Sequence, residues 1–165
     1  MKKVFFLVST ILCTSLLAQS QNQPGKKKES VLILETGVSS DWDFKSNYTS
    51  LSPTFGFEFR TLKEKLEVEV GATPYYSNSN YNWQLEMLIK KPYDISPQME
   101  IMFGAGPKWT LSSEGNSASV DIVTDLMYWP FKKRIGFYFE PGYDYGLKNQ
   151  HEQSLGISTG LIVGL

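Results

Sequence analysis

An alternation of apolar and polar side chains is the feature of this sequence that most constrains its fold. In the stretch SPTFGFEFR, residues 52–60, three phenylalanines alternate with Gly56, Glu58 and Arg60. Successive side chains of a strand point to opposite faces, so the stretch predicts a strand with one apolar and one polar face. The same period of two recurs from residue 31 onward, without a helical period or a heptad repeat, so we predict an all-β chain.

Eight segments carry this alternation, and each is close to the 9–11 residues that a tilted transmembrane strand needs. The predicted strands are residues 31–38, 48–60, 66–76, 81–90, 99–111, 118–129, 135–145 and 154–165. Prolines inside strands remove a ladder donor, so we expect four of them to occupy rim or bulge positions: Pro53, Pro74, Pro107 and Pro141.

Glycine decides which face of these strands is the inside. Ten glycines fall on the polar face: Gly37, Gly56, Gly71, Gly104, Gly106, Gly136, Gly142, Gly156, Gly160 and Gly164. On a water-exposed strand glycine only weakens the strand, whereas the narrow lumen of an eight-stranded barrel needs small residues between long ones. The prediction is therefore an antiparallel up-and-down transmembrane barrel with a polar, glycine-rich lumen and outward-facing phenylalanines. The alternative is a soluble lipocalin-like carrier, in which the apolar face would line the interior.

The predicted lumen carries a network of charged residues: Glu35, Glu58, Arg60, Glu67, Glu69, Glu86, Lys90, Glu100, Lys108, Asp121, Asp125, Glu140 and Asp144. Carboxylates in such excess must be paired, hydrated or partly protonated. We expect them to form ion pairs and shared protons that largely plug the barrel. A narrow cation-favouring pore is the alternative, for which eight strands leave little room.

The N-terminus predicts export. Lys2 and Lys3 precede an apolar run that ends in small residues, Ala18 and Ser20, as in a secretory signal peptide. We expect a signal peptide over residues 1–20, a polar lead-in over 21–30 and one barrel domain over 31–165. An apolar outer face on an exported chain indicates contact with lipid, and a closed barrel leaves no unpaired strand edge there.

The loops and aromatic residues agree with a membrane barrel. Four connections become outer loops, SSDWDFKSN, SNSN, SSEGNS and GLKNQHEQ, and three become periplasmic turns, TLKEK, KPYDISPQ and PFKKR. Tyrosine and tryptophan residues near the predicted strand ends are typical of interfacial girdles: Tyr76, Tyr81, Trp83, Trp109, Tyr128, Trp129, Tyr143 and Tyr145.

In strand pattern and length, the chain resembles the small eight-stranded outer-membrane barrels of double-membraned bacteria, of the OmpA-barrel and OmpX type. The resemblance extends to the last strand, SLGISTGLIVGL, and rests on architecture rather than on a signature motif. It implies a monomer in the cell outer membrane, surrounded by outer-membrane lipids. It also implies folding by the barrel-assembly machinery, which recognises the last strand, although Leu165 replaces the family's usual terminal aromatic residue.

The sequence does not favour catalysis or a cofactor. A net charge of −1 gives no indication of a nucleic-acid partner, and no cysteine or histidine cluster predicts a metal site. We expect a structural or surface-interaction protein that is not an enzyme and has no catalytic, cofactor-binding or metal-binding residues. Outer-membrane lipid A deacylases and acyltransferases share the architecture, so a lipid-modifying enzyme is the alternative, with His151, Glu152 and Ser154 as its only candidate group.

Overall fold

The computed structural model describes residues 32–45, 48–61, 66–77, 80–113, 115–131, 134–147 and 152–165. The regular elements within these ranges are all strands. None of the described residues forms a helix long and apolar enough to cross a membrane. The predicted signal peptide and polar lead-in lie outside the described residues.

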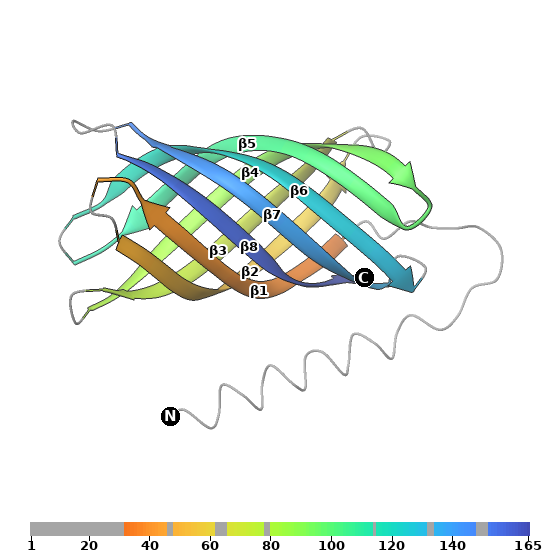
Figure 1. Cartoon of the computed structure of the whole chain (residues 1–165), viewed down its shortest axis with the longest axis horizontal. Helices are drawn as coiled ribbons and strands as arrows, with labels where there is room; N and C mark the ends of the chain where they lie inside the picture. The colour runs from red at the N-terminus through yellow and green to blue at the C-terminus, as the bar shows by residue number, and fades with distance from the viewer. Residues whose placement is uncertain are drawn as a thin grey trace, which may run out of the picture.

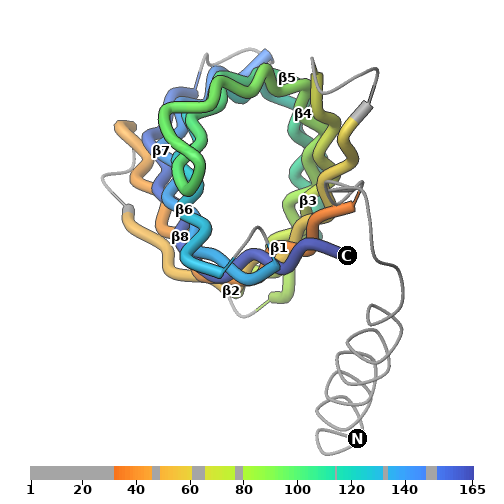
Figure 2. Tube along the Cα trace, turned by 90° about the vertical axis from the view of Figure 1, so that its right-hand side faces the viewer, coloured from red at the N-terminus to blue at the C-terminus, as the bar shows by residue number. Residues whose placement is uncertain are grey.

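Eight antiparallel strands form one closed barrel (Figures 1 and 2). They are β1 (Leu32–Asp43), β2 (Tyr48–Thr61), β3 (Leu66–Ser77), β4 (Asn80–Ser96), β5 (Met99–Leu111), β6 (Ser117–Phe131), β7 (Ile135–Gly146) and β8 (Gln153–Gly164). Each strand pairs with the strands before and after it in sequence, and β8 pairs with β1 to close the sheet. The predicted up-and-down barrel is confirmed.

Two strands extend five or more residues beyond their predicted ends. β1 continues beyond Val38 to Asp43, through residues assigned to the first outer loop, because Asp43 is paired with Tyr48 on one side and Ser154 on the other. β4 continues to Ser96, through most of the predicted KPYDISPQ turn, and pairs there with β5. Pairing with β2 and β8 keeps the β1 extension extended, and pairing with β5 keeps the β4 extension extended.

The four prolines do not create bulges. Pairing between β4 and β5 passes from Glu86↔Lys108 to Ile89↔Ala105 in the same register, so Pro107 leaves the register unchanged. Among the described strands, the register shifts lie between Asp94 and Ser96 and between Tyr128 and Phe131. The bulge alternative is therefore wrong for Pro53, Pro74, Pro107 and Pro141, and their rim position stays a prediction.

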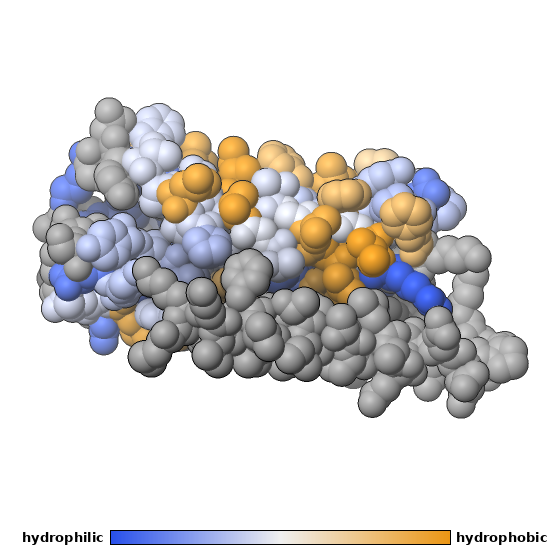
Figure 3. All heavy atoms as spheres, turned by 90° about the horizontal axis from the view of Figure 1, so that it is seen from below, coloured by the Kyte–Doolittle hydropathy of each residue, from blue (hydrophilic) through white to orange (hydrophobic). Residues whose placement is uncertain are grey.

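The polar face is the inside of the barrel, as predicted. Phe57 is 48% exposed on the outer wall, whereas its neighbour Glu58 is 0% exposed. The same contrast between neighbours recurs along the strands, and one side of the outer wall shows apolar side chains gathered over its middle (Figure 3). The predicted soluble alternative, with apolar residues lining the lumen throughout, is not the observed arrangement.

One end of the interior is apolar, which was not predicted from the sequence, and the girdle position predicted for Trp129 is wrong because its side chain is 2% exposed inside the barrel. An apolar cluster packs where β1 begins and β6 and β8 end: Ile33, Met102, Met127, Trp129, Tyr138 and Ile162. The backbone N–H of Trp129 donates to the Gln98 carbonyl at 2.7 Å and ties β6 to the β4–β5 turn. This apolar cluster is the hydrophobic core of the molecule.

A larger side chain on the inner wall should destabilise the barrel, whereas a larger side chain on the outer wall should not. A Cβ at Gly106 would collide with the Met87 carbonyl, and one at Gly104 would lie 2.6 Å from Lys90 Cγ. We expect Gly106→Leu to lower the free energy of unfolding in detergent or lipid by about 1–3 kcal/mol or more, as overpacking does. Ala105→Leu, between the two glycines on the exposed outer face, is the matched control. Equal unfolding midpoints in urea for the two variants would contradict the assignment of faces.

Candidate functional site

The charged residues expected in the lumen all occupy inward-facing strand positions. Buried among them are Glu35, Glu58, Glu67, Glu69, Lys90, Glu100, Lys108, Asp121, Asp125 and Glu140, and half-buried are Arg60, Glu86 and Asp144. Ten of the thirteen form three groups, each around one cation, and the other three are Glu35, Glu58 and Glu86. These groups are stacked along the barrel interior.

Arg60 holds the first group. Its Nε lies 2.8 Å from Glu67 Oε1 on the adjacent strand, and its Nη2 donates to Glu100 Oε2 at 2.8 Å. Arg60 and Glu67 are directly paired across β2 and β3, which fixes the first contact, whereas Glu100 comes from β5. A guanidinium with its planar fork of donors suits two carboxylates approaching from different strands.

Lys90 holds the second group and is completely buried. Its ammonium pairs with Glu69 on β3, with Asp125 on β6 at 3.1 Å and with Glu140 on β7. One side chain of β4 therefore connects strands on different sides of the barrel. Three carboxylates around one ammonium leave an excess of negative charge in a region without exposed surface.

Lys108 holds the third group beside a polar cavity. Its Nζ lies 2.6 Å from Asp144 Oδ2 and 3.7 Å from Asp121 Oδ2, and Ser119 Oγ donates to Asp144 Oδ1 at 3.0 Å. The cavity is lined by Ser39, Asp41, Thr73, Gln84, Glu86, Lys108, Asp121, Val123, Glu140, Gly142, Asp144, Gly156 and Ser158. These lining residues place the cavity in the half of the barrel away from the apolar cluster.

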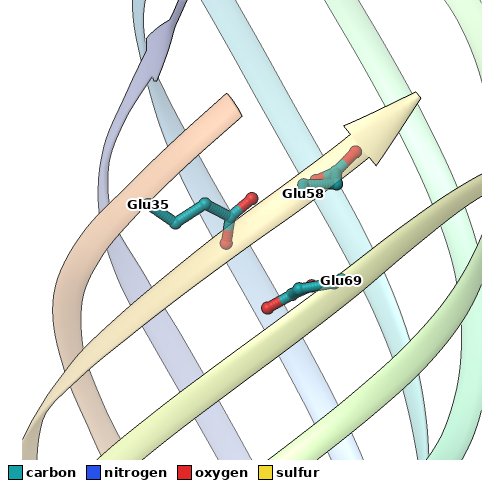
Figure 4. A group of neighbouring side chains, drawn as sticks. All are labelled: Glu35, Glu58 and Glu69. Carbon is teal, nitrogen blue, oxygen red and sulfur yellow. The ribbon is translucent and has the colours of Figure 1, made fainter. Parts of the chain in front are cut away.

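Three glutamates form a further group on neighbouring strands, shown in Figure 4. Glu35, Glu58 and Glu69 come from β1, β2 and β3, and each contributes a carboxylate oxygen that lies within 4.8 Å of the other two. The sequence analysis expected no metal site, and the spacing of these residues along the chain gave no signal for one. A group of three buried carboxylate ligands is the arrangement in this barrel that comes nearest to a cation site.

Asp41 is an interior residue that the sequence analysis missed. It lines the polar cavity, and it belongs to the part of β1 that was assigned to a loop. Continuing the inward alternation of Glu35, Gly37 and Ser39 by one more step would have found it.

The candidate group for an enzyme falls at the edge of the described structure. His151 lies outside the described residues. Glu152 is exposed, with its Oε1 3.9 Å from Lys45 Nζ, and Ser154 is half-buried on β8. The lipid-modifying alternative thus stays a prediction.

Comparison of the chain with known proteins gives a match in structure but not in sequence. No family model matches it, and no curated protein matches it. Neisserial surface protein A superposes with a TM-score of 0.63 at 13% identity, over 81% of this chain and 96% of that one. The chain has the fold of a small transmembrane barrel. The N-terminal barrel domain of Pseudomonas aeruginosa OprF matches with a TM-score of 0.55 at 13% identity, over 82% of this chain and 99% of that domain.

A designed protein shares the fold as well. A de novo transmembrane β-barrel matches with a TM-score of 0.53 at 15% identity, covering 85% of this chain and 100% of the design. The architecture expected from the resemblance to small outer-membrane barrels is confirmed.

Removing the buried ammonium of Lys90 should lower the free energy of unfolding far more than removing the exposed ammonium of Lys91. Lys90→Met would leave Glu69, Asp125 and Glu140 without their shared cation, and breaking a buried ion pair in this way costs about 3–5 kcal/mol. Lys91 is the matched control because it points outward, with its Nζ 5.3 Å from the Tyr93 ring centroid. Lys91→Met should lower the free energy of unfolding by about 1 kcal/mol or less. Urea unfolding in detergent measures both, and similar losses would show that the carboxylates do not depend on Lys90.

Proposed function

We propose that this protein is an integral outer-membrane barrel with a structural or surface-interaction role and a largely sealed interior. The observation that carries the proposal is the reversed distribution of residues, with an apolar outer wall around a charged interior. Exposing an apolar outer wall to water is costly in free energy. Soluble monomers therefore rarely expose apolar patches of more than a few hundred Å². A bilayer removes that cost, and the closed sheet leaves no edge unpaired in it.

Aromatic side chains near both ends support a membrane-spanning position. Near the β3–β4 loop, the rings of Tyr76 and Tyr81 lie 5.2 Å apart, and Trp83 is exposed beside them. Near the β4–β5 turn, Tyr93 packs edge-on against Phe103 with ring centroids 6.0 Å apart. Amphipathic aromatic rings at two levels are typical of the interfacial girdles of such barrels.

The interior supports a sealed barrel more than a pore. The apolar cluster fills the end at which β1 begins, and the ion pairs of Arg60 and Lys90 join strands that are not neighbours. With the lead-in on the periplasmic side, this sealed end faces the periplasm and the polar cavity lies toward the outer loops. A cation-favouring pore would need a continuous water path through both layers.

The apolar outer wall and the sealed interior also support a non-catalytic role. We infer a monomer surrounded by outer-membrane lipids and folded by the barrel-assembly machinery, without a cofactor. The neisserial neighbour is named a surface protein, which agrees with a surface role for this chain. The short connections leave the outer wall and the loop end as the surfaces available for interaction.

Insertion in a membrane is tested by a spin label at Phe57. A nitroxide on Phe57→Cys should, in liposomes, collide with oxygen and be shielded from a water-soluble nickel complex, because the position faces lipid. The control is Ser113→Cys in the exposed β5–β6 loop, where nickel should collide freely with the label. A label at Phe57 that is immobilised and reached by neither reagent would place this residue in a protein core. In cells, the chain should fractionate with the outer membrane.

Sealing is tested by planar-bilayer recordings. The wild-type barrel should show little or no steady conductance, because the apolar cluster excludes water. Trp129→Ala removes a 2%-exposed ring from that cluster and should increase the frequency of openings. Tyr128→Ala, which removes a ring from the outer wall, should leave the recordings unchanged. Large, stable, cation-selective steps from the wild type would show that the barrel is a pore.

A further inference from the structure

We propose that Glu35, Glu58 and Glu69 bind a divalent cation of the size of Ca²⁺ inside the barrel. The three residues lie on neighbouring strands, one each on β1, β2 and β3 (Figure 4). The site goes beyond the proposed function, and it does not depend on whether the barrel conducts ions.

The spacing of the carboxylate oxygens fits one ion. Glu58 and Glu69 are directly paired across β2 and β3, whereas Glu35 pairs with Gly56, two residues before Glu58. One oxygen from each residue lies within 4.8 Å of the other two. Calcium binds oxygen at about 2.3–2.6 Å, so two of its ligands can be separated by about 5 Å at most. Even at the full 4.8 Å separation, three such oxygens surround a point about 2.8 Å from each, so a movement of a few tenths of an ångström lets them share one calcium ion.

An unpartnered carboxylate points to a ligand at this position. Glu58 is 0% exposed, and neither of its oxygens has a hydrogen-bond partner among the described residues. Glu35 Oε1 also lacks one. A buried carboxylate without a donor is costly, and native proteins rarely leave one in that state. While they are ionised, Glu35 and Glu69 only accept hydrogen bonds, so in that state neither supplies a donor to Glu58.

The local charge balance favours a cation. Lys90 is the nearest positive group, but within the described residues it pairs with Glu69, Asp125 and Glu140 and makes no ion pair with Glu35 or Glu58. The region thus contains five buried carboxyl groups and one ammonium. A divalent ion beside Glu58 offsets two of the remaining negative charges, which in a low-dielectric interior is a large gain.

Gly56 makes room for the ligands. A Cβ at this position would lie 3.1 Å from Glu69 Oε1, closer than most Cβ atoms approach a neighbour, and 3.5 Å from Glu35 Oε2, in ordinary van der Waals contact. Calcium takes six to eight oxygen ligands, so water must complete the shell. Glu140, which contacts Lys90 and lines the polar cavity, places water-accessible space next to this region.

The test measures Ca²⁺ binding to the full-length barrel, purified in detergent and stripped with a chelator. Equilibrium dialysis should find one saturable Ca²⁺ per wild-type chain, and Ca²⁺ should raise the thermal unfolding midpoint. Loss of even an outer-shell partner weakens metal sites by about 10–100-fold, so Glu58→Gln should weaken binding by about tenfold or more. The matched control is Glu67→Gln, which changes another completely buried glutamate that is paired with Arg60 instead, and it should bind like the wild type.

Two results would overturn the proposal. The first is a wild-type barrel that binds no Ca²⁺ at about 1 mM, the weak end of natural calcium sites, as expected if Glu35 and Glu58 share a proton instead. The second is undiminished binding by Glu58→Gln, which would place the ion elsewhere. If Glu58→Gln does not fold, Glu35→Gln is judged by the same criterion. Gly56→Ala should weaken binding as well, because the added Cβ crowds the Glu69 carboxylate.

Discussion

Closure of β8 onto β1 is the constraint on which the rest of the structure depends. Pairing between Ile33↔Gly164 and Asp43↔Ser154 along this seam joins the last strand to the first, so the strands form a ring without a free edge. With eight strands, the ring encloses a space only wide enough for side chains. That limited space explains why glycines such as Gly106 alternate with long charged residues on the inner wall, and why the large apolar residues occupy the outer wall.

The closed interior is organised in layers along the barrel axis. Apolar side chains around Trp129 and the ion pairs of Arg60 share one end, the ion pairs of Lys90 occupy the middle, and a polar cavity beside Lys108 lies toward the longer loops. Carboxylates outnumber cations throughout the charged layers. The excess is most concentrated at Glu35, Glu58 and Glu69, and a bound cation or a shared proton must compensate it.

Most of the strand assignment could be made from sequence because a period of two is a local property. β5 is observed at the predicted residues, and β2, β3, β7 and β8 differ by a residue at their ends. The larger errors concern Ser39–Asp43 and the continuation of β4 beyond Lys90, where polar or proline-containing segments resemble loops. Only pairing with neighbouring strands keeps these segments extended, with β2 and β8 for Ser39–Asp43 and with β5 for β4.

The sequence by itself determined the number of strands, their up-and-down order and most of the charged residues that face inward, because alternation and glycine placement follow from neighbouring positions in one strand. Only the tertiary structure decided which inward residues meet. Lys90 reaches Asp125 and Glu140 across the barrel, and these residues are 35 and 50 positions away in the chain. The apolar cluster and the three-glutamate group arise in the same way. Such contacts depend on strand register and ring closure, which place inward side chains at the same height, and no local pattern specifies that height.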